Sequence, residues 1–232
     1  MKKMMSILLA LALSLGLLAG CGGGNGTPPQ SGGDSSGGEE AAPKAAAFKL
    51  GTAAKNGAQI AVDEINALGG IQFELRYEDD EHDAEKAVNA YNKLKDWGMQ
   101  LSLGSVTSPP AVATSVKNFE DRIFALTPSA SAIAVVEGKD NVFQMCFTDP
   151  NQGSASAQYI FDKGLGTKIG IIYKNDDVYS KGIYNTFVSK AGELGLDIVS
   201  TTTFTEDSKT DFSVQLTDAK NKGADLIFLP IY

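Results

Sequence analysis

The chain is poor in the residues that most catalytic and metal sites need. Its 232 residues include one histidine, two cysteines and one tryptophan. Two cysteines cannot form a disulfide framework, and one histidine leaves too few nitrogen and sulfur ligands for a structural zinc site. The sequence also lacks a phosphate-binding glycine loop, a nucleophile elbow and a zinc-protease helix motif. We therefore predict that the protein is not an enzyme and that it carries no metal or other cofactor.

Positive charge is scarce as well. Twenty Lys and Arg residues stand against 28 Asp and Glu, the formal net charge is -8 at pH 7, and no basic run exceeds two residues. Affinity for nucleic acid comes mainly from neutralising phosphates with Lys and Arg. The composition therefore argues against nucleic-acid binding. With 43% hydrophobic residues, it favours a globular protein of one or two domains.

Residues 1–20 have the pattern of a secretory signal. Lys2 and Lys3 precede an apolar run from Ile7 to Leu18, which is too short to cross a bilayer comfortably. The ending Leu-Ala-Gly-Cys at 18–21 resembles a bacterial lipobox, in which the cysteine is lipidated and becomes the first residue of the mature protein. The alternative is an ordinary signal peptide that happens to contain a cysteine. We expect Cys21 to carry a lipid that anchors the protein outside the cytoplasm.

Residues 21–47 are predicted to form a flexible linker. They are mostly Gly, Ser, Pro, Asn and Ala, and such a segment cannot bury enough apolar surface to offset its ordering entropy. It would tether a folded body to the membrane. If Cys21 is lipidated, Cys146 has no disulfide partner within the chain, and we interpret it as a small buried apolar residue.

From Phe48 onward the hydrophobic pattern alternates between strand and helix periods. Strands that alternate with helices predict parallel βαβ units, so the fold class is α/β with doubly wound parallel sheets. The Asp149-Pro150-Asn151 break is the expected boundary between an N-terminal lobe, 48–150, and a C-terminal lobe, 151–232. The expected strands are 48–50, 73–77, 99–103, 123–126, 142–147, 169–173, 197–204 and 226–229, and the expected helices are 54–68, 83–97 with Asp83 as cap, 108–120, 152–163, 180–194 and 211–222.

The single histidine, His82, lies in the acidic stretch 78–83. This stretch lacks the central glycine and the terminal glutamate spacing of a calcium-binding loop. We therefore interpret it as a solvated turn between a strand and a helix.

Two loops that follow expected strands are candidates for ligand contact. In open α/β sheets, ligands bind beyond the carboxyl ends of the strands. Ser108, as the N-cap of a helix, would place a hydroxyl and several unpaired amides at a positive helix end, which suits a carboxylate. The small hydroxyl residues of 127–131 would leave room for a ligand and offer hydrogen-bonding groups. The alternative is an ordinary helix cap and a polar turn.

Four segments, 56–71, 104–108, 125–131 and 179–182, resemble in order the branched-chain amino acid binding proteins of ABC importers. The resemblance extends over residues 48–232. It implies the type I periplasmic-binding fold, in which two lobes capture an amino acid between them. It further implies a monomeric extracytoplasmic lipoprotein that delivers its ligand to an ABC-type membrane permease. An aliphatic or branched-chain amino acid is the expected ligand.

The resemblance also implies the site residues. Ser108 matches the serine whose hydroxyl and amide hold the ligand carboxylate. Ser129 and Ser131 match the pair that offers a backbone carbonyl and a hydroxyl to the head group of the amino acid. Tyr179 matches the second-lobe tyrosine that closes over the ligand, and Tyr232 falls where the family often has another aromatic wall.

The chain departs from the family at two places. Leu50-Gly51-Thr52 leads directly from the expected first strand into a helix, where the family has a glycine-containing loop with an aromatic residue. The sequence also stops at Tyr232, where the family continues through the second lobe. We expect a gene fragment or a shortened product, and a truncated form that binds no ligand is one alternative. Others are a ligand-sensing module of the same fold in signalling, and an α/β enzyme, against which the single histidine and the missing nucleophile motif argue.

Overall fold

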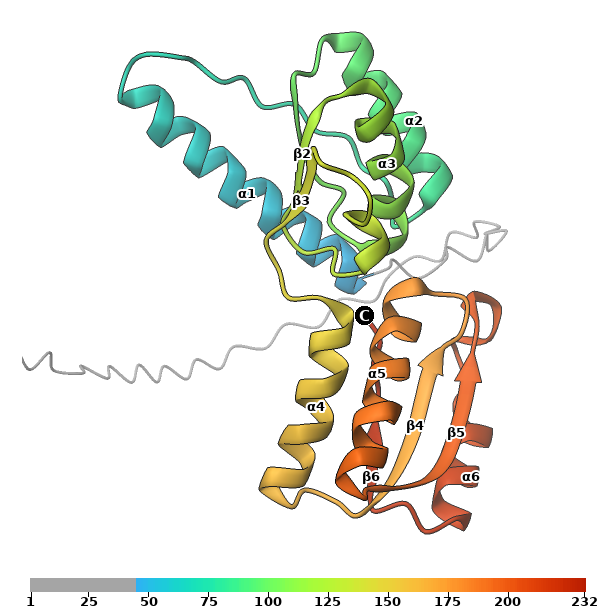
Figure 1. The fold of residues 1–232 in the computed structure, drawn as a ribbon. Coiled ribbons are helices and arrows are strands. Elements are labelled where there is room, and N and C mark those ends of the chain that lie inside the picture. The colour runs from blue at the N-terminus through green and yellow to red at the C-terminus, as the bar shows by residue number, and fades with distance from the viewer. Residues whose placement is uncertain (1–44) are drawn as a thin grey trace, which may run out of the picture. The chain divides into compact units, whose positions relative to one another are not determined.

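A computed structural model describes residues 45–232, with side chains from Leu50 onward (Figure 1). The predicted signal peptide, the predicted lipidation site Cys21 and the predicted linker up to residue 44 lie outside the described residues. The helices are α1 (Ala45–Ala67), α2 (Ala84–Trp97), α3 (Ser108–Asp121), α4 (Asp149–Lys163), α5 (Val178–Leu194) and α6 (Ser213–Asn221), with short 3-10 helices η1 (Ile133–Val135) and η2 (Glu206–Ser208). The strands are β1 (Leu101–Leu103), β2 (Phe124–Thr127), β3 (Val142–Gln144), β4 (Lys168–Lys174), β5 (Asp197–Phe204) and β6 (Leu226–Phe228).

The strands form two parallel three-stranded sheets. The first has the order β1-β2-β3 and the second has the order β5-β4-β6. All strands of the first sheet precede α4, which begins at Asp149, and all strands of the second follow it. The predicted α/β class with parallel sheets is therefore confirmed. In the described part of the chain, no helix combines the length and the apolar character that crossing a bilayer would require.

The core beside the first sheet is built from small side chains. Buried alanines of α3, β2 and the following loop pack with Val135 and Val142, and Ala125 stands opposite Val142 in the parallel register. Helix α2 packs on α3, where the hydroxyl of the buried Tyr91 donates to a carboxylate oxygen of Asp121 at 2.7 Å. Small residues let α3 lie close to the sheet, which fixes the position of its first turn.

The second sheet has helices on both faces. Successive side chains of a strand point to opposite faces, and Ile169 and Ile171 of β4 pack in one buried cluster with Phe187 of α5. Gly170 lies between them in sequence and faces α6, since a Cβ there would stand 3.1 Å from the Cβ of Ala219. Helices α4 and α5 lie side by side (Figure 1). Burying one side chain the size of Phe187 is worth about 1.5–3 kcal/mol.

The predicted strand at 48–50 is wrong, because these residues lie within α1. The helix also includes 45–47, which the sequence suggested as the end of the linker. Helix propagation is favourable once a turn exists, and the helix tolerates Gly51 and Gly57, each of which costs about 1 kcal/mol relative to alanine. Alternation over three residues is too weak a signal against a 23-residue helix.

The predicted strand at 73–77 is also wrong, because this segment forms no ladder with any described strand. The backbone groups of a strand need hydrogen-bond partners on a neighbouring strand. Here the side chain of Asn66 takes the place of such a partner: it accepts from the Phe73 amide and donates to the Phe73 carbonyl, both at 2.8 Å. The segment instead lines a cavity of about 1220 Å³, together with α1 and with Leu101 and Leu103 of β1.

Candidate functional site

The first turn of α3 differs from the expected cap in one respect. Thr107, with φ −111° and ψ 155°, is the N-cap, and Ser108 is the first helical residue. Pro109 and Pro110 follow it. Proline suits the first helical turn but carries no N–H. The expectation of several unpaired amides is therefore wrong, and Ser108 supplies the amide that points out of this helix end.

Ser108 is fully buried and joins three segments of the chain. Its hydroxyl oxygen accepts from the amides of Ser131 and Ala132, each at 3.2 Å. Its own amide donates to the hydroxyl of Tyr232 at 3.2 Å. The Tyr232 hydroxyl also donates to the Ser108 hydroxyl oxygen at 3.5 Å, so three donors surround that oxygen. The structure thus brings Ser108, Ser131 and Tyr232 together.

The loop after β2 is shaped by hydroxyl groups. Thr127 donates from its side chain to the carbonyl of Ser105 at 2.7 Å and accepts from the amide of Ala130 at 3.1 Å. Ser131 is buried, and its carbonyl accepts from the amide of Asp149 at 3.0 Å. Ser129 is half-buried on the same loop. Nearby, Cys146 is half-buried rather than fully buried, its thiol donates to the carbonyl of Ala130 at 3.3 Å, and burial raises the pKa of that thiol.

The two predicted tyrosines lie against each other. The rings of Tyr179 and Tyr232 stack with centroids 4.2 Å apart and an interplanar angle of 20°. The expected turn at 179–182 is the first turn of α5, so Tyr179 is helical, and its hydroxyl accepts from the side-chain amide of Gln152 at 3.2 Å. Burial raises the pKa of Tyr232 to about 12 and raises the pKa of Tyr179. Both phenols are therefore neutral hydrogen-bonding groups at pH 7.

His82, interpreted above as part of a solvated turn, lies in this site, and its side chain is only 15% exposed. Its Nδ1 is 2.7 Å from Oγ1 of Thr107, and its Nε2 is 3.7 Å from Oδ2 of Asp177. The imidazole and the ring of Tyr232 form a T-shaped contact, with centroids 5.3 Å apart and an interplanar angle of 76°. Among the described residues no strand precedes His82, so the sequence pattern gave no signal that places it beside Thr107.

The order Thr107, His82, Asp177 has the residue types of a hydrolase triad, but its geometry does not support one. In a triad the nucleophile is open to substrate and the acid hydrogen-bonds the imidazole. Here Thr107 is 3% exposed, and the 3.7 Å between His82 and Asp177 exceeds a hydrogen bond. Asp177 instead accepts from the amides of Tyr179 and Ser180 and caps α5. The arrangement is suited to binding.

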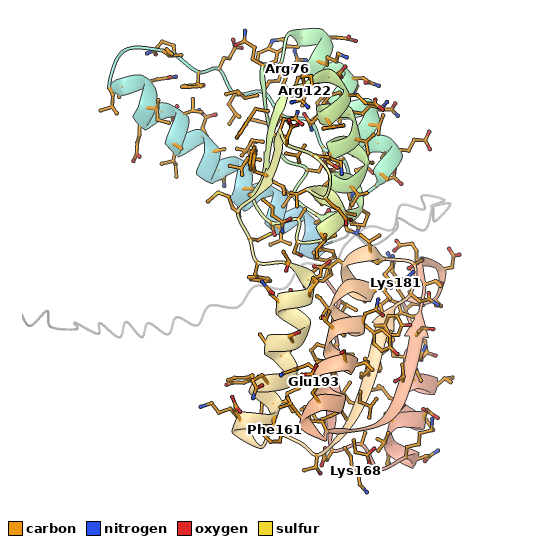
Figure 2. All side chains as sticks on the ribbon, viewed as in Figure 1. Arg76, Arg122, Phe161, Lys168, Lys181 and Glu193 are labelled. Atoms are coloured by element: carbon orange, nitrogen blue, oxygen red, sulfur yellow. The ribbon has the colours of Figure 1, made fainter. Side chains whose placement is uncertain are left out.

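A second buried carboxyl group lies beside Asp177. Asp149, at the start of α4, is 1% exposed, and burial raises its pKa to about 6, with the Ser131 hydroxyl opposing the shift and the charge of Asp177 adding to it. One of its oxygens, Oδ1, has no hydrogen-bond partner. Lys181, which follows Asp177 on α5, is exposed (Figure 2). Sequence reasoning missed His82, Asp149 and Asp177, because single residues at the ends of helices form no motif that points to a site.

The large cavity of about 1220 Å³ adjoins this site without coinciding with it. It reaches the site at His82 and Thr107, whereas its main lining comes from α1, residues 71–82 and the end of α2. We place the candidate site at the serine and tyrosine cluster because hydrogen-bonding groups and aromatic faces converge there.

Comparison with known proteins identifies the fold. Residues 44–231 match the family described as periplasmic binding protein. The chain belongs to this family. The Leu/Ile/Val-binding protein BraC3 of Rhizobium johnstonii is 32% identical over 186 residues, which are 78% of this chain and 50% of the relative. The Leu/Ile/Val-binding protein homolog 3 of Brucella melitensis is 31% identical over 187 residues, 79% of this chain and 50% of that protein.

Solved structures agree. The branched-chain amino acid transporter substrate binding protein LivJ of Streptococcus pneumoniae, in complex with isoleucine, superposes with a TM-score of 0.72 at 32% identity, covering 79% of this chain and 53% of that one. The leucine binding protein LivK of Thermotoga maritima gives a TM-score of 0.71 at 26% identity, covering 80% and 52%. This periplasmic binding protein therefore has the type I periplasmic-binding fold, and its relatives are binding proteins rather than enzymes. The chain spans about half the length of these relatives.

Proposed function

We propose that this chain is the ligand-capturing part of an extracytoplasmic solute-binding lipoprotein for an aliphatic, branched-chain amino acid. The observation that carries the proposal is Ser108, whose amide and hydroxyl lie at the positive end of α3 beside the Tyr179 and Tyr232 rings. The names of its relatives, Leu/Ile/Val-binding proteins at 31% and 32% identity, support the same ligand class.

In this proposal the ligand carboxylate binds at Ser108. The hydroxyl oxygen of Tyr232 accepts from the Ser108 amide, and a carboxylate oxygen would take that place with the advantage of a full negative charge at a helix N-terminus. The carbonyl of Ser129 and the hydroxyl of Ser131 face the ammonium group. The rings of Tyr179 and Tyr232 cover the aliphatic side chain, which requires apolar area rather than hydrogen bonds.

The remaining parts supply anchoring and delivery. Lipidation of Cys21 holds the protein at the outer face of the membrane, and residues 21–47 serve as the tether. Lobes 48–150 and 151–232 close over the ligand by hinge rotation, and the monomeric protein passes the amino acid to an ABC-type permease. A ligand-sensing role in signalling would use the same site, and it differs in requiring a signalling partner instead of a permease.

Equilibrium dialysis of the purified chain with labelled leucine, isoleucine and valine tests the binding step. We expect dissociation constants in the micromolar range and recovery of unchanged ligand by mass spectrometry. Leucinamide, which lacks the carboxylate, and benzoate, which lacks the ammonium group, are the matched ligands and should bind at least tenfold more weakly. A folded protein that retains none of the three amino acids at 100 micromolar contradicts the proposal.

A further inference from the structure

The turn before α2 holds His82 in an unfavourable backbone conformation. Glu81 and His82 have φ values of 50° and 60°, in the left-handed region that residues with a Cβ seldom adopt. The side chain of Asp79 accepts from the Glu81 amide at 2.9 Å, and that of Asp80 accepts from the His82 amide at 3.0 Å. Such strain persists where the surroundings over-determine it, and it concentrates at functional positions.

The conformation directs the imidazole between two helix N-termini. On one side, Nδ1 lies 2.7 Å from the hydroxyl of Thr107, the N-cap of α3. The Thr107 hydroxyl makes no capping bond to its own helix, because Pro109 and Pro110 have no N–H to donate to it, so this hydroxyl is available to the histidine. On the other side, Nε2 lies 3.7 Å from one oxygen of Asp177, while the second oxygen caps α5. Helices α3 and α5 are in contact.

We propose that His82 is a positioning residue that holds the first turn of α3 against the first turn of α5. Ser108 follows Thr107 directly, and Tyr179 lies two residues after Asp177. The imidazole, which is hydrogen-bonded to Thr107 and in a longer polar contact of 3.7 Å with Asp177, therefore sets how far Ser108 stands from Tyr179. The imidazole also forms a T-shaped contact with the ring of Tyr232. Since these three residues are the proposed carboxylate and aromatic contacts, the inference rests on the proposed function.

The first test needs no ligand. The chain contains one histidine, so ¹⁵N-histidine labelling of the full chain yields one pair of imidazole resonances. Thr107→Val should move the Nδ1 resonance, and Asp177→Asn should move the Nε2 resonance. Asparagine caps helices as well as aspartate does, so Asp177→Asn keeps the α5 cap. If neither substitution moves its resonance, the ring does not join the two helices and the proposal fails.

The second test measures leucine binding. His82→Gly removes the side chain at a position whose left-handed backbone glycine tolerates, and we expect leucine affinity to fall about tenfold. Glu81→Gly relieves the neighbouring strain while keeping His82, and it should bind leucine like the wild type. His82→Gly combined with Asp177→Asn should bind no more weakly than His82→Gly alone, because the shared link is already lost.

The outcomes separate this inference from the function it rests on. Wild-type chain that binds no leucine overturns the proposed function, while the imidazole resonances still test the link. Wild-type chain that binds leucine, with His82→Gly binding equally well, overturns the positioning role alone.

Discussion

The amide of Ser108 donates a hydrogen bond of 3.2 Å to the hydroxyl of Tyr232, across 124 positions of sequence. This one contact connects the first turn of α3 with the segment that follows β6. The amide belongs to a fully buried residue, so an acceptor is needed there whether or not a ligand is bound. The acceptor in this structure is a neutral phenol, and the proposed acceptor in a complex is a carboxylate.

Tyr232→Phe should therefore separate folding from binding. The substitution keeps the ring that stacks on Tyr179 but removes the acceptor of the Ser108 amide, and we expect a loss of about 1 kcal/mol in the ligand-free free energy of unfolding. Leucine restores an acceptor, so its addition should raise the melting temperature more in Tyr232→Phe than in the wild type. Tyr184→Phe, whose ring stacks on Tyr173 away from the site, is the control and should show the wild-type increase. An equal increase in all three proteins contradicts the carboxylate position.

Ser108→Ala should destabilise the fold as well as the site. The hydroxyl oxygen of Ser108 is the acceptor for two buried amides, those of Ser131 and Ala132, and leaving buried donors unsatisfied costs about 1–3 kcal/mol. Ser115→Ala is a matched control on the same helix. Ser115 is equally buried, but its hydroxyl donates only to the carbonyl of Val112 within α3. Urea denaturation should show a clear loss for Ser108→Ala and a loss below about 0.5 kcal/mol for the control. Equal losses would mean that Ser108 does not organise the loop.

Gly153→Ala should weaken the contact between α4 and α5. A Cβ at Gly153 would stand 2.1 Å from Oγ1 of Thr186 and 2.4 Å from the carbonyl of Ile183, so the helices must move apart. Overpacking of this kind costs about 1–3 kcal/mol. At Gly192, on α5, an added Cβ meets nothing within 4 Å. Gly192→Ala should therefore stabilise the protein by about 0.5–1 kcal/mol through helix propensity. Thermal unfolding of the two variants measures both effects. If Gly153→Ala stabilises the protein, α4 and α5 do not pack closely at this position.

Local features were predictable from the sequence. The strand 197–204 has the predicted bounds, because its run of β-branched Ile, Val and Thr residues favours a strand without distant information. Asp83 caps α2 as predicted, accepting from the amide of Lys86 at 2.8 Å. Both follow from side chains acting on their own neighbours.

Features that depend on distant partners were not predictable. The pattern at 73–77 is that of a strand, but alternation cannot reveal that no described strand pairs with it. His82 stands in an acidic turn by sequence, and only the fold places it against Thr107 and Asp177. Within the site, the resemblance pointed to serines and tyrosines that lie close together in the structure. It did not show that Thr107, and not Ser108, is the N-cap of α3, because either of two adjacent hydroxyl residues could have that role.

Asp149 should make stability depend on pH in the opposite sense to most carboxylates. Burial raises its pKa from 3.8 to about 6, so between these values the folded protein keeps a proton that the unfolded chain releases. The contribution of Asp149 to stability is therefore greatest below about pH 4, decreases as the pH rises toward 6, and is a constant penalty of roughly 2–3 kcal/mol above that. Other carboxylates, including Asp121 and Asp218, have lowered pKa values and change stability in the other direction.

Comparison with Asp149→Asn isolates this effect. The amide has nearly the same shape and cannot ionise, so the variant and the wild type should be equally stable at pH 4, while at pH 7 the variant should be more stable by roughly 2 kcal/mol. Asp162→Asn, on the exposed side of the same helix, makes the same change of charge without burial and should leave the pH dependence unchanged. Urea denaturation at pH 4, 5, 6 and 7 provides the measurement. A difference between wild type and Asp149→Asn that stays constant across this range would show that the carboxyl group is ionised throughout, and that its surroundings are more polar than the unpartnered Oδ1 indicates.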